Sequence, residues 1–299
     1  MKKRSIALLL LLALLTGCGA KKEEAPWQTA YRETGKYLQE QDTLSAGSVG
    51  GEWAVIGLSR AGLLSDEAAQ SYEQAAEDYV KQADSGRLDR LKSTENSRTI
   101  LGLTAAGYNA ADVAGVDLTS GLSDMNYLRI QGLNGPIWAL IALDCHGYDI
   151  PQCAEGGEQT TRAGLVAEIL TSQCSDGGWT LAGDTADVDM SAMALTALAA
   201  YKEDDEVKAA VDAALVYLSD AQQEDGGFIS WGEPNSESCS QVIVALTALG
   251  IDPAADARFA KAGGTAIDAL CAFACEGGGF RHSDEQMESD GMATEQGFY

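Results

Sequence analysis

Basic residues are scarce in this chain, and their scarcity excludes the commonest charged partners. The 299 residues include 20 Lys and Arg against 45 Asp and Glu, which gives a formal net charge of −25. A charge of that sign repels nucleic acid and an anionic lipid surface. We therefore expect no nucleic-acid partner, and an acidic excess of this kind is typical of a solvated surface.

Histidine and β-strand patterns are almost missing as well. The chain has two histidines, His146 and His282, so a mechanism built on histidine has little to draw on. Alternation of polar and apolar residues is rare, and apolar residues recur at helical spacing instead. Hydrophobic residues make up 45% of the chain. The composition therefore favours an all-α body with a sizeable core.

The N-terminal apolar run, Ser5–Leu15, is too short for a stable bilayer-spanning helix. Three basic residues precede it, and it ends in Leu15-Thr16-Gly17-Cys18, which matches the bacterial lipobox. In a lipobox the cysteine is diacylated and becomes the first residue of the mature protein. We predict a signal peptide over 1–17, lipidation at Cys18, a tether over 18–36, and anchoring on the extracytoplasmic face of a bacterial cell membrane.

Six further cysteines lie beyond Cys18, and an oxidising compartment permits disulfides between them. Their even number allows fifteen pairings. Cys145 and Cys153 flank a loop and could pair, whereas Cys271 and Cys275 lie four apart on an expected helix, where disulfide geometry is awkward. We expect most of the six to be buried free thiols, and the sequence leaves any pairing open.

An internal repeat organises the rest of the chain. The segments Gln173–Trp179, Gln222–Phe228 and, more weakly, Ala274–Phe280 recur roughly 50 residues apart. An Ala-rich apolar segment comes after each of the first two, as in Met193–Leu198 and Val244–Leu249, and fainter copies of it lie upstream.

Polar-faced helices are expected between these apolar segments, over Asp66–Gln82, Thr161–Gln173, Val207–Gln222 and Ala262–Cys275. A helix that is apolar on every side belongs inside, and its polar-faced partner belongs outside. Counting the expected helices along the chain gives an α/α toroid of six outer–inner helix pairs over 37–299. The last inner helix is expected to begin near Met292 and to be cut short at Tyr299. We therefore expect an incomplete C-terminal end, and the nature of any further domain stays open.

The repeat also resembles a known pattern. The run Tyr217-Leu218-x-x-x-Gln222-x-x-x-Gly226-x-Phe228 is similar to the QW-type repeat of the terpenoid cyclase and protein prenyltransferase superfamily. Over about residues 45–299 the chain looks like secreted bacterial toroid proteins that often carry a transcobalamin-like domain after the toroid, on the segments Glu95–Ile100, Gly132–Trp138 and Asn235–Gln241. The resemblance implies the fold. It does not fix an activity, because the superfamily includes enzymes, cobalamin carriers and thioester domains.

The QW segments have a structural interpretation. Glutamine at a helix C-terminus can bond backbone groups left free there, and a Gly-Gly pair allows a tight reversal with positive φ. We expect Trp179 and Phe228 to be wedged between neighbouring helices.

Candidate binding residues lie where the N-termini of the inner helices converge and present their positive dipole ends. Acidic and small polar residues there are good helix caps. They could also form a carboxylate-rimmed mouth with aromatic walls. The candidates are Trp53, Asn134, Trp138, Asp187, Asp189, Trp231, Glu237, Cys239 and Glu295.

The resemblance implies two enzyme alternatives. Class II terpenoid cyclases use an Asp-x-Asp-Asp run, and Asp189 keeps the acid position while Met190 replaces the last Asp. Prenyltransferases bind zinc through an Asp-x-Cys pair and a later His. Glu237 and Cys239 nearly match this pair, but Thr294 stands where the His is expected. Thioester domains need a cysteine shortly before a Glu-Gln pair, and no cysteine precedes Glu295-Gln296 in this way.

Our leading prediction is a non-catalytic binding module for a small hydrophobic or cobalamin-like ligand or an envelope partner. An isoprenoid cyclase or prenyltransferase is the first alternative, and a structural or adhesion protein is the second. No resident cofactor is predicted, with cobalamin as a ligand and zinc left open.

Overall fold

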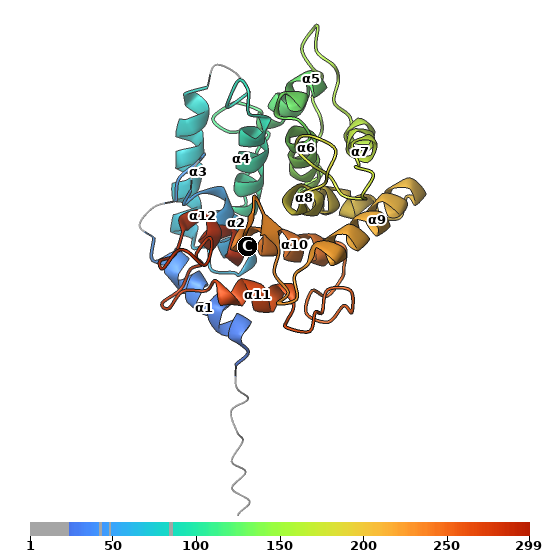
Figure 1. Ribbon diagram of the computed structural model, residues 1–299. Coiled ribbons are helices and arrows are strands. Elements are labelled where there is room, and N and C mark those ends of the chain that lie inside the picture. The colour runs from blue at the N-terminus through green and yellow to red at the C-terminus, as the bar shows by residue number, and fades with distance from the viewer. Residues whose placement is uncertain (1–23, 42–43, 48, 84–85) are drawn as a thin grey trace, which may run out of the picture.

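The computed structural model describes residues 24–41, 44–47, 49–83 and 86–299. The expected signal peptide and Cys18 lie outside these ranges. In the described residues, six helices form an inner ring, in which each helix contacts the next and the last contacts the first (Figure 1). They are α2 (Glu52–Arg60), α4 (Ser93–Ala105), α6 (Asn134–Asp144), α8 (Val188–Leu198), α10 (Ser236–Ala248) and α12 (Gly291–Phe298). The predicted all-α toroid is confirmed.

An outer layer packs around this ring. It comprises α1 (Pro26–Gln39), α3 (Asp66–Lys81), α7 (Arg162–Thr171), α9 (Asp205–Ala221) and α11 (Ala266–Ala272). Between α4 and α6 the outer element is broken into η1 (Leu118–Leu122), α5 (Met125–Leu128) and η2 (Arg129–Gln131). The short helix η3 (Ala199–Tyr201) extends α8, and the strands β1 (Ile229–Ser230) and β2 (Glu233–Pro234) form a hairpin before α10.

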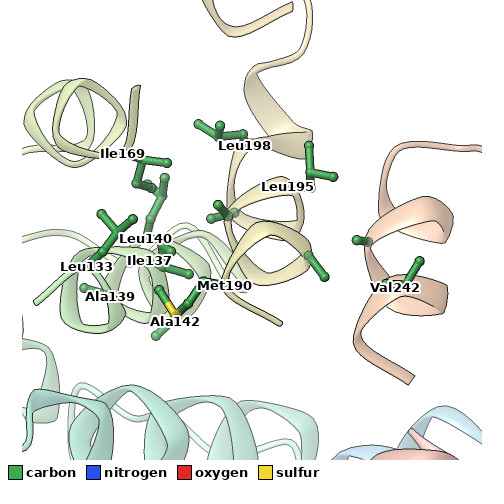
Figure 2. Close-up of a cluster of buried hydrophobic side chains, with 14 of the residues drawn as sticks. Leu133, Ile137, Ala139, Leu140, Ala142, Ile169, Met190, Leu195, Leu198 and Val242 are labelled. Carbon is green, nitrogen blue, oxygen red and sulfur yellow. The ribbon is translucent and has the colours of Figure 1, made fainter. Parts of the chain in front are cut away.

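The inner helices are buried on nearly every side, as expected for helices without a polar face. Small residues such as Ala139 and Ala192 are fully buried and let neighbouring helices approach closely. Figure 2 shows Leu140 of α6 lying close to Ile169 of α7, with Met190 of α8 on the other side of α6. One continuous hydrophobic core therefore runs around the ring between the two layers.

The start of the body lies earlier in the chain than we expected. The predicted boundary at residue 37 falls inside α1, so the tether expected over 18–36 overlaps this helix. Pro26 occupies the first turn, where its missing N–H costs nothing. Thr34, Gly35 and Leu38 are buried, and α1 contacts α2, α11 and α12. The polar face of α1 concealed this role in the sequence.

The QW segments form the turns that connect outer to inner helices. Gln173 Nε2 donates to the carbonyls of Gly177 and Ala210 at 2.7 and 2.8 Å. Gln222 Nε2 makes the equivalent bonds to Gly226 and Phe259 at 2.9 and 3.1 Å. Gly177 and Gly226 have φ of 96° and 91°.

The aromatics of these segments are buried as predicted. Trp179 is fully buried and its Nε1 donates to the Ile169 carbonyl at 2.7 Å, while Phe228 is also fully buried. The structural interpretation of both residues is therefore confirmed.

The six described cysteines are free thiols. The expectation that most would be buried is wrong, because Cys239 alone among these six is buried and Cys145 is exposed. No helix within the described ranges is both long and apolar enough to cross a membrane.

Candidate functional site

The N-terminal ends of α2 and α4 carry a buried charged cluster. Glu52 is fully buried, and its Oε1 accepts a hydrogen bond from the Gly47 N–H at 2.7 Å. Arg98 Nε lies 3.3 Å from Glu52 Oε2, and Arg98 Nη2 lies 2.7 Å from Glu95 Oε2. Burial raises the pKa of Glu52, although the Arg98 charge acts against it. The cluster joins two neighbouring inner helices to the loop before α2.

Glu295 belongs to the same end of the ring. It lies in α12, and its Oε1 accepts a hydrogen bond from the backbone N–H of Gly50. Burial raises the pKa of Glu295 to about 7. Glu295 therefore connects α12, the last inner helix, to the loop that leads into α2, the first inner helix.

Asp187 and Asp189 occupy the start of α8. Asp187 is the N-cap and accepts a hydrogen bond from the Met190 N–H at 2.8 Å. Burial raises its pKa. The two oxygens of Asp189 accept hydrogen bonds from the hydroxyls of Ser230 and Ser238, both at 2.7 Å. The Asp189 carboxylate thus links α8 to the hairpin and to α10.

Glu237 is paired with a histidine. Its Oε2 lies 2.8 Å from Nδ1 of His282, and Glu233 Oε1 lies 3.5 Å from Nε2 of the same ring. Burial lowers the pKa of His282, but the two carboxylates outweigh this effect and the pKa is raised. Because the carboxylates occupy opposite edges of the ring, they do not converge on one position with the histidine.

The zinc alternative depended on Glu237 and Cys239. Cys239 is fully buried, and burial raises the pKa of its thiol to about 12. A cysteine binds a metal ion as its thiolate, which this environment disfavours. Within the described ranges, no three His, Cys, Asp or Glu side chains form a group that could hold a metal ion.

The expected aromatic wall forms in part. The rings of Trp53 and Trp138 lie 5.1 Å apart between centroids, and Trp53 stacks on Tyr299 at 5.1 Å. Trp231 is 96% exposed on the β1–β2 turn with φ of 54°, and it lies apart from them. Asn134 is the first residue of α6, and its buried Oδ1 has no hydrogen-bond partner in the described part of the chain.

The axis of the ring is largely filled by side chains. A cavity of about 80 Å³ remains there, and it is lined by residues from α2, α4, α6, α8 and α10, including Trp53, Ile56, Leu101, Trp138, Met193 and Val244. None of the carboxylates at the helix N-termini lines it. The expected carboxylate-rimmed mouth does not coincide with this cavity, and the carboxylates at the helix N-termini are engaged in the contacts described above.

A larger cavity of about 370 Å³ lies between α1, α10, α11 and α12. Its wall is mainly apolar and contains Tyr31, Ile243, Leu270, Phe280 and Phe298. Four lining residues are shared with the axial cavity, namely Arg60, Thr196, Val244 and Tyr299. Among the residues that the structure describes, no Asp or Glu lines either cavity.

The sequence did not reveal this cavity. Its lining residues come from helices that are far apart in the chain, and an apolar residue facing a cavity has the same pattern as one facing the core. Tyr31 was assigned to the tether, and Arg60 ends an ordinary apolar helix. Only the closure of the ring brings them together.

Comparison with known proteins supports the architecture. No protein-family model and no curated protein matches the chain. Among solved structures, a variant of the type II terpene cyclase MstE from Scytonema is similar, with a TM-score of 0.58 and 15% identity over 86% of this chain and 80% of that chain. The likeness shows a terpenoid cyclase-like α/α-toroid fold.

Proposed function

We propose that this protein is a non-catalytic binding module, held on the extracytoplasmic face of a bacterial membrane through a lipid on Cys18. It takes a small hydrophobic molecule into the cavity between α1, α10, α11 and α12. The observation that carries the proposal is the mainly apolar wall of this 370 Å³ cavity. Ligand sites are typically apolar hollows of roughly 300–1,000 Å³ with a few polar groups.

The size of the cavity favours one of the predicted ligand classes. At 370 Å³ it is at the small end of the range for drug-sized ligands. A corrinoid such as cobalamin is several times larger than such a ligand. The cavity therefore suits a small hydrophobic molecule better than a cobalamin.

The placement of Asp189 argues against acid catalysis in the cavity. Asp189 lies near the start of α8, whereas Thr196 of the same helix lines the cavity. Seven residues of α-helix span about 10 Å. A general acid must come within about 3 Å of the atom it protonates. Asp189 is also engaged by two hydroxyls. The described part of the chain places no acidic side chain at the cavity wall.

The proposal is tested with a neutral hydrophobic fluorophore, N-phenyl-1-naphthylamine, and the full chain carrying Cys18→Ser, which cannot be acylated. Ile243→Trp fills the cavity from α10, and Val216→Trp adds the same ring to an exposed position on α9. We expect saturable binding that Ile243→Trp weakens at least about tenfold, because the ring occupies the ligand's space. Val216→Trp should change it less than about twofold.

Both variants are checked by circular dichroism, so a loss of binding is not confused with a loss of fold. Unsaturable binding, or full affinity in folded Ile243→Trp, would show that the cavity is not the site. The cyclase alternative has its own assay, in which the chain is incubated with an isoprenoid. Product that disappears in Asp189→Asn would replace the carrier with an enzyme.

A further inference from the structure

We infer that the ligand of this cavity carries an anionic head group, bound by Arg60, on an apolar tail. The inference rests on the proposed function and names its ligand class. Arg60 is the last residue of α2, it is exposed, and it lines both the axial cavity and the larger one. Arg60 is thus one of the residues that the walls of the two cavities share.

Arg60 differs in its surroundings from seven other arginines of the chain. Ion pairs with carboxylates engage Arg32, Arg87, Arg98, Arg129, Arg162, Arg258 and Arg281. Arg60 has no carboxylate within ion-pairing distance in the described part of the chain. With 45 acidic residues against 20 basic ones, a guanidinium left without a carboxylate is unexpected. The counter-charge for Arg60 is therefore open to a ligand.

The position of Arg60 at a helix C-terminus does not explain why this residue lies in the wall of the cavity. A cation in the last turn is favoured by the helix dipole, but that effect requires no particular direction of the side chain. Here Arg60 lines a cavity whose wall contains no Asp or Glu from the described ranges. The hydroxyl of Tyr299, on the same wall, stays neutral because burial raises its pKa to about 12.

The acidic surface does not prevent an anion from reaching this site. At physiological ionic strength the Debye length is about 8 Å, so distant carboxylates are largely screened. A head group in contact with the Arg60 guanidinium lies well within this length, and a guanidinium binds carboxylate or phosphate through two parallel hydrogen bonds. The tail then lies along Ile243, Leu270 and Phe298, inside the cavity.

Four probes with the same twelve-carbon tail test the inference by calorimetry at pH 7.5, below their micelle concentrations. Dodecanoate and dodecyl phosphate carry the anionic head group, dodecanol is neutral, and dodecyltrimethylammonium is cationic. We expect at least one of the anions to bind about tenfold or more tightly than dodecanol, since hydrogen bonds to charged groups are the strong ones. Whichever anion binds more tightly identifies the head group as carboxylate or phosphate.

Two variants assign the effect to Arg60. Arg60→Met keeps the length of the side chain and removes its charge, and it should lower the affinity for the anion to that for dodecanol while leaving dodecanol unchanged. Arg258→Gln removes an exposed arginine away from the cavity and should change neither affinity.

A chemical readout locates the bound probe. Cys271 lines the cavity and Cys145 is exposed and does not line it. Bound dodecanoate should slow alkylation of Cys271 by N-ethylmaleimide and leave Cys145 unaffected, as measured by peptide mass spectrometry.

The outcomes separate this inference from the proposed function. Equal binding of dodecanol and the anions, unchanged in Arg60→Met, would overturn the inference and leave a neutral hydrophobic ligand. Preference for dodecyltrimethylammonium would overturn it as well. No binding of any probe, together with no binding of the neutral fluorophore, would remove the proposed function itself.

Discussion

The buried carboxyl groups of Glu52 and Glu295, at the N-terminal end of the inner ring, have different partners to offset the effect of burial on their pKa values. Glu52 lies 3.3 Å from the guanidinium of Arg98, whose charge offsets part of the rise in the pKa of Glu52 that burial causes. Glu295 is paired with the Gly50 N–H, and Arg98 acts on it more weakly than the burial does. The pKa of Glu295 is therefore raised to about 7. Its charge state changes near neutral pH, which makes the stability of the ring depend on pH.

We predict that Glu295→Gln removes this dependence. A carboxyl whose pKa is raised on folding contributes stability below its unfolded pKa, and this contribution is lost as pH rises through the folded pKa. Between pH 5 and pH 8 the free energy of unfolding of the unmodified chain should fall relative to the variant by about 2–3 kcal/mol. Urea denaturation at both pH values measures the difference.

Glu285→Gln is the matched control, because Glu285 is exposed. Its free energy of unfolding should track that of the unmodified chain at both pH values. A difference between Glu295→Gln and the unmodified chain that does not change with pH would mean that Glu295 titrates as an ordinary exposed carboxyl.

Among the elements of the fold, the turns after α7 and α9 are held by the same kind of hydrogen bonds. A glutamine amide at the end of the outer helix bonds the carbonyl of the glycine turn and a second carbonyl from the next outer unit. The third copy has Ala274 in place of the glutamine. There the hydroxyl of Thr34 in α1 accepts a hydrogen bond from the Gly279 N–H at 3.0 Å. The first outer helix thus helps hold the last turn.

We predict that Gln222→Ala destabilises the protein by about 1–3 kcal/mol, because it leaves the carbonyls of Gly226 and Phe259 buried without a donor. Gln223→Ala is the control, since Gln223 is exposed and, within the described ranges, its side-chain amide donates only to the nearby Ala221 carbonyl. Its effect should stay within about 0.5 kcal/mol. Equal denaturation midpoints for the two variants would show that the amide does not hold the turn.

These turns were also the most predictable elements. Glutamine, two glycines and an aromatic recur at fixed offsets, so their role could be derived from the sequence, as could the apolar helices behind them. The broken outer element over η1, α5 and η2 has no such signature. The role of α1 was hidden because its contacts include helices near the other end of the chain. The exposure of Trp231, and the positive φ of its backbone, could not be read from the sequence.

For the whole molecule, closure of the ring decides which residues form a cavity. The charged residues at the helix N-termini could be located from the repeat, but their partners could not. Asp189 meets Ser230 and Ser238, and Glu295 meets Gly50, only through long-range packing. Arg60 is brought to the larger cavity in the same way. The sequence therefore predicted the architecture and the ends of the helices, while the candidate site depends on contacts across the ring.

The closing contact centres on Phe298 of α12. Its ring is buried and stacks on Tyr31 of α1 at 4.8 Å between centroids. It also fits against Gly35 of α1 and Gly57 of α2, where an added Cβ would come within 3.0 and 2.7 Å of the ring. Glycine at these two positions therefore lets the ring of Phe298 pack between the first and last units.

We predict that Phe298→Ala lowers the free energy of unfolding by about 3–5 kcal/mol, as expected for an aromatic side chain removed from a packed core. Trp231→Ala removes a larger ring that is 96% exposed, and it should change stability by less than about 0.5 kcal/mol. Urea denaturation monitored by circular dichroism measures both. If the two variants unfold at the same urea concentration, Phe298 does not secure the closure, and the first and last units are held together chiefly by the Glu295 and Thr34 contacts.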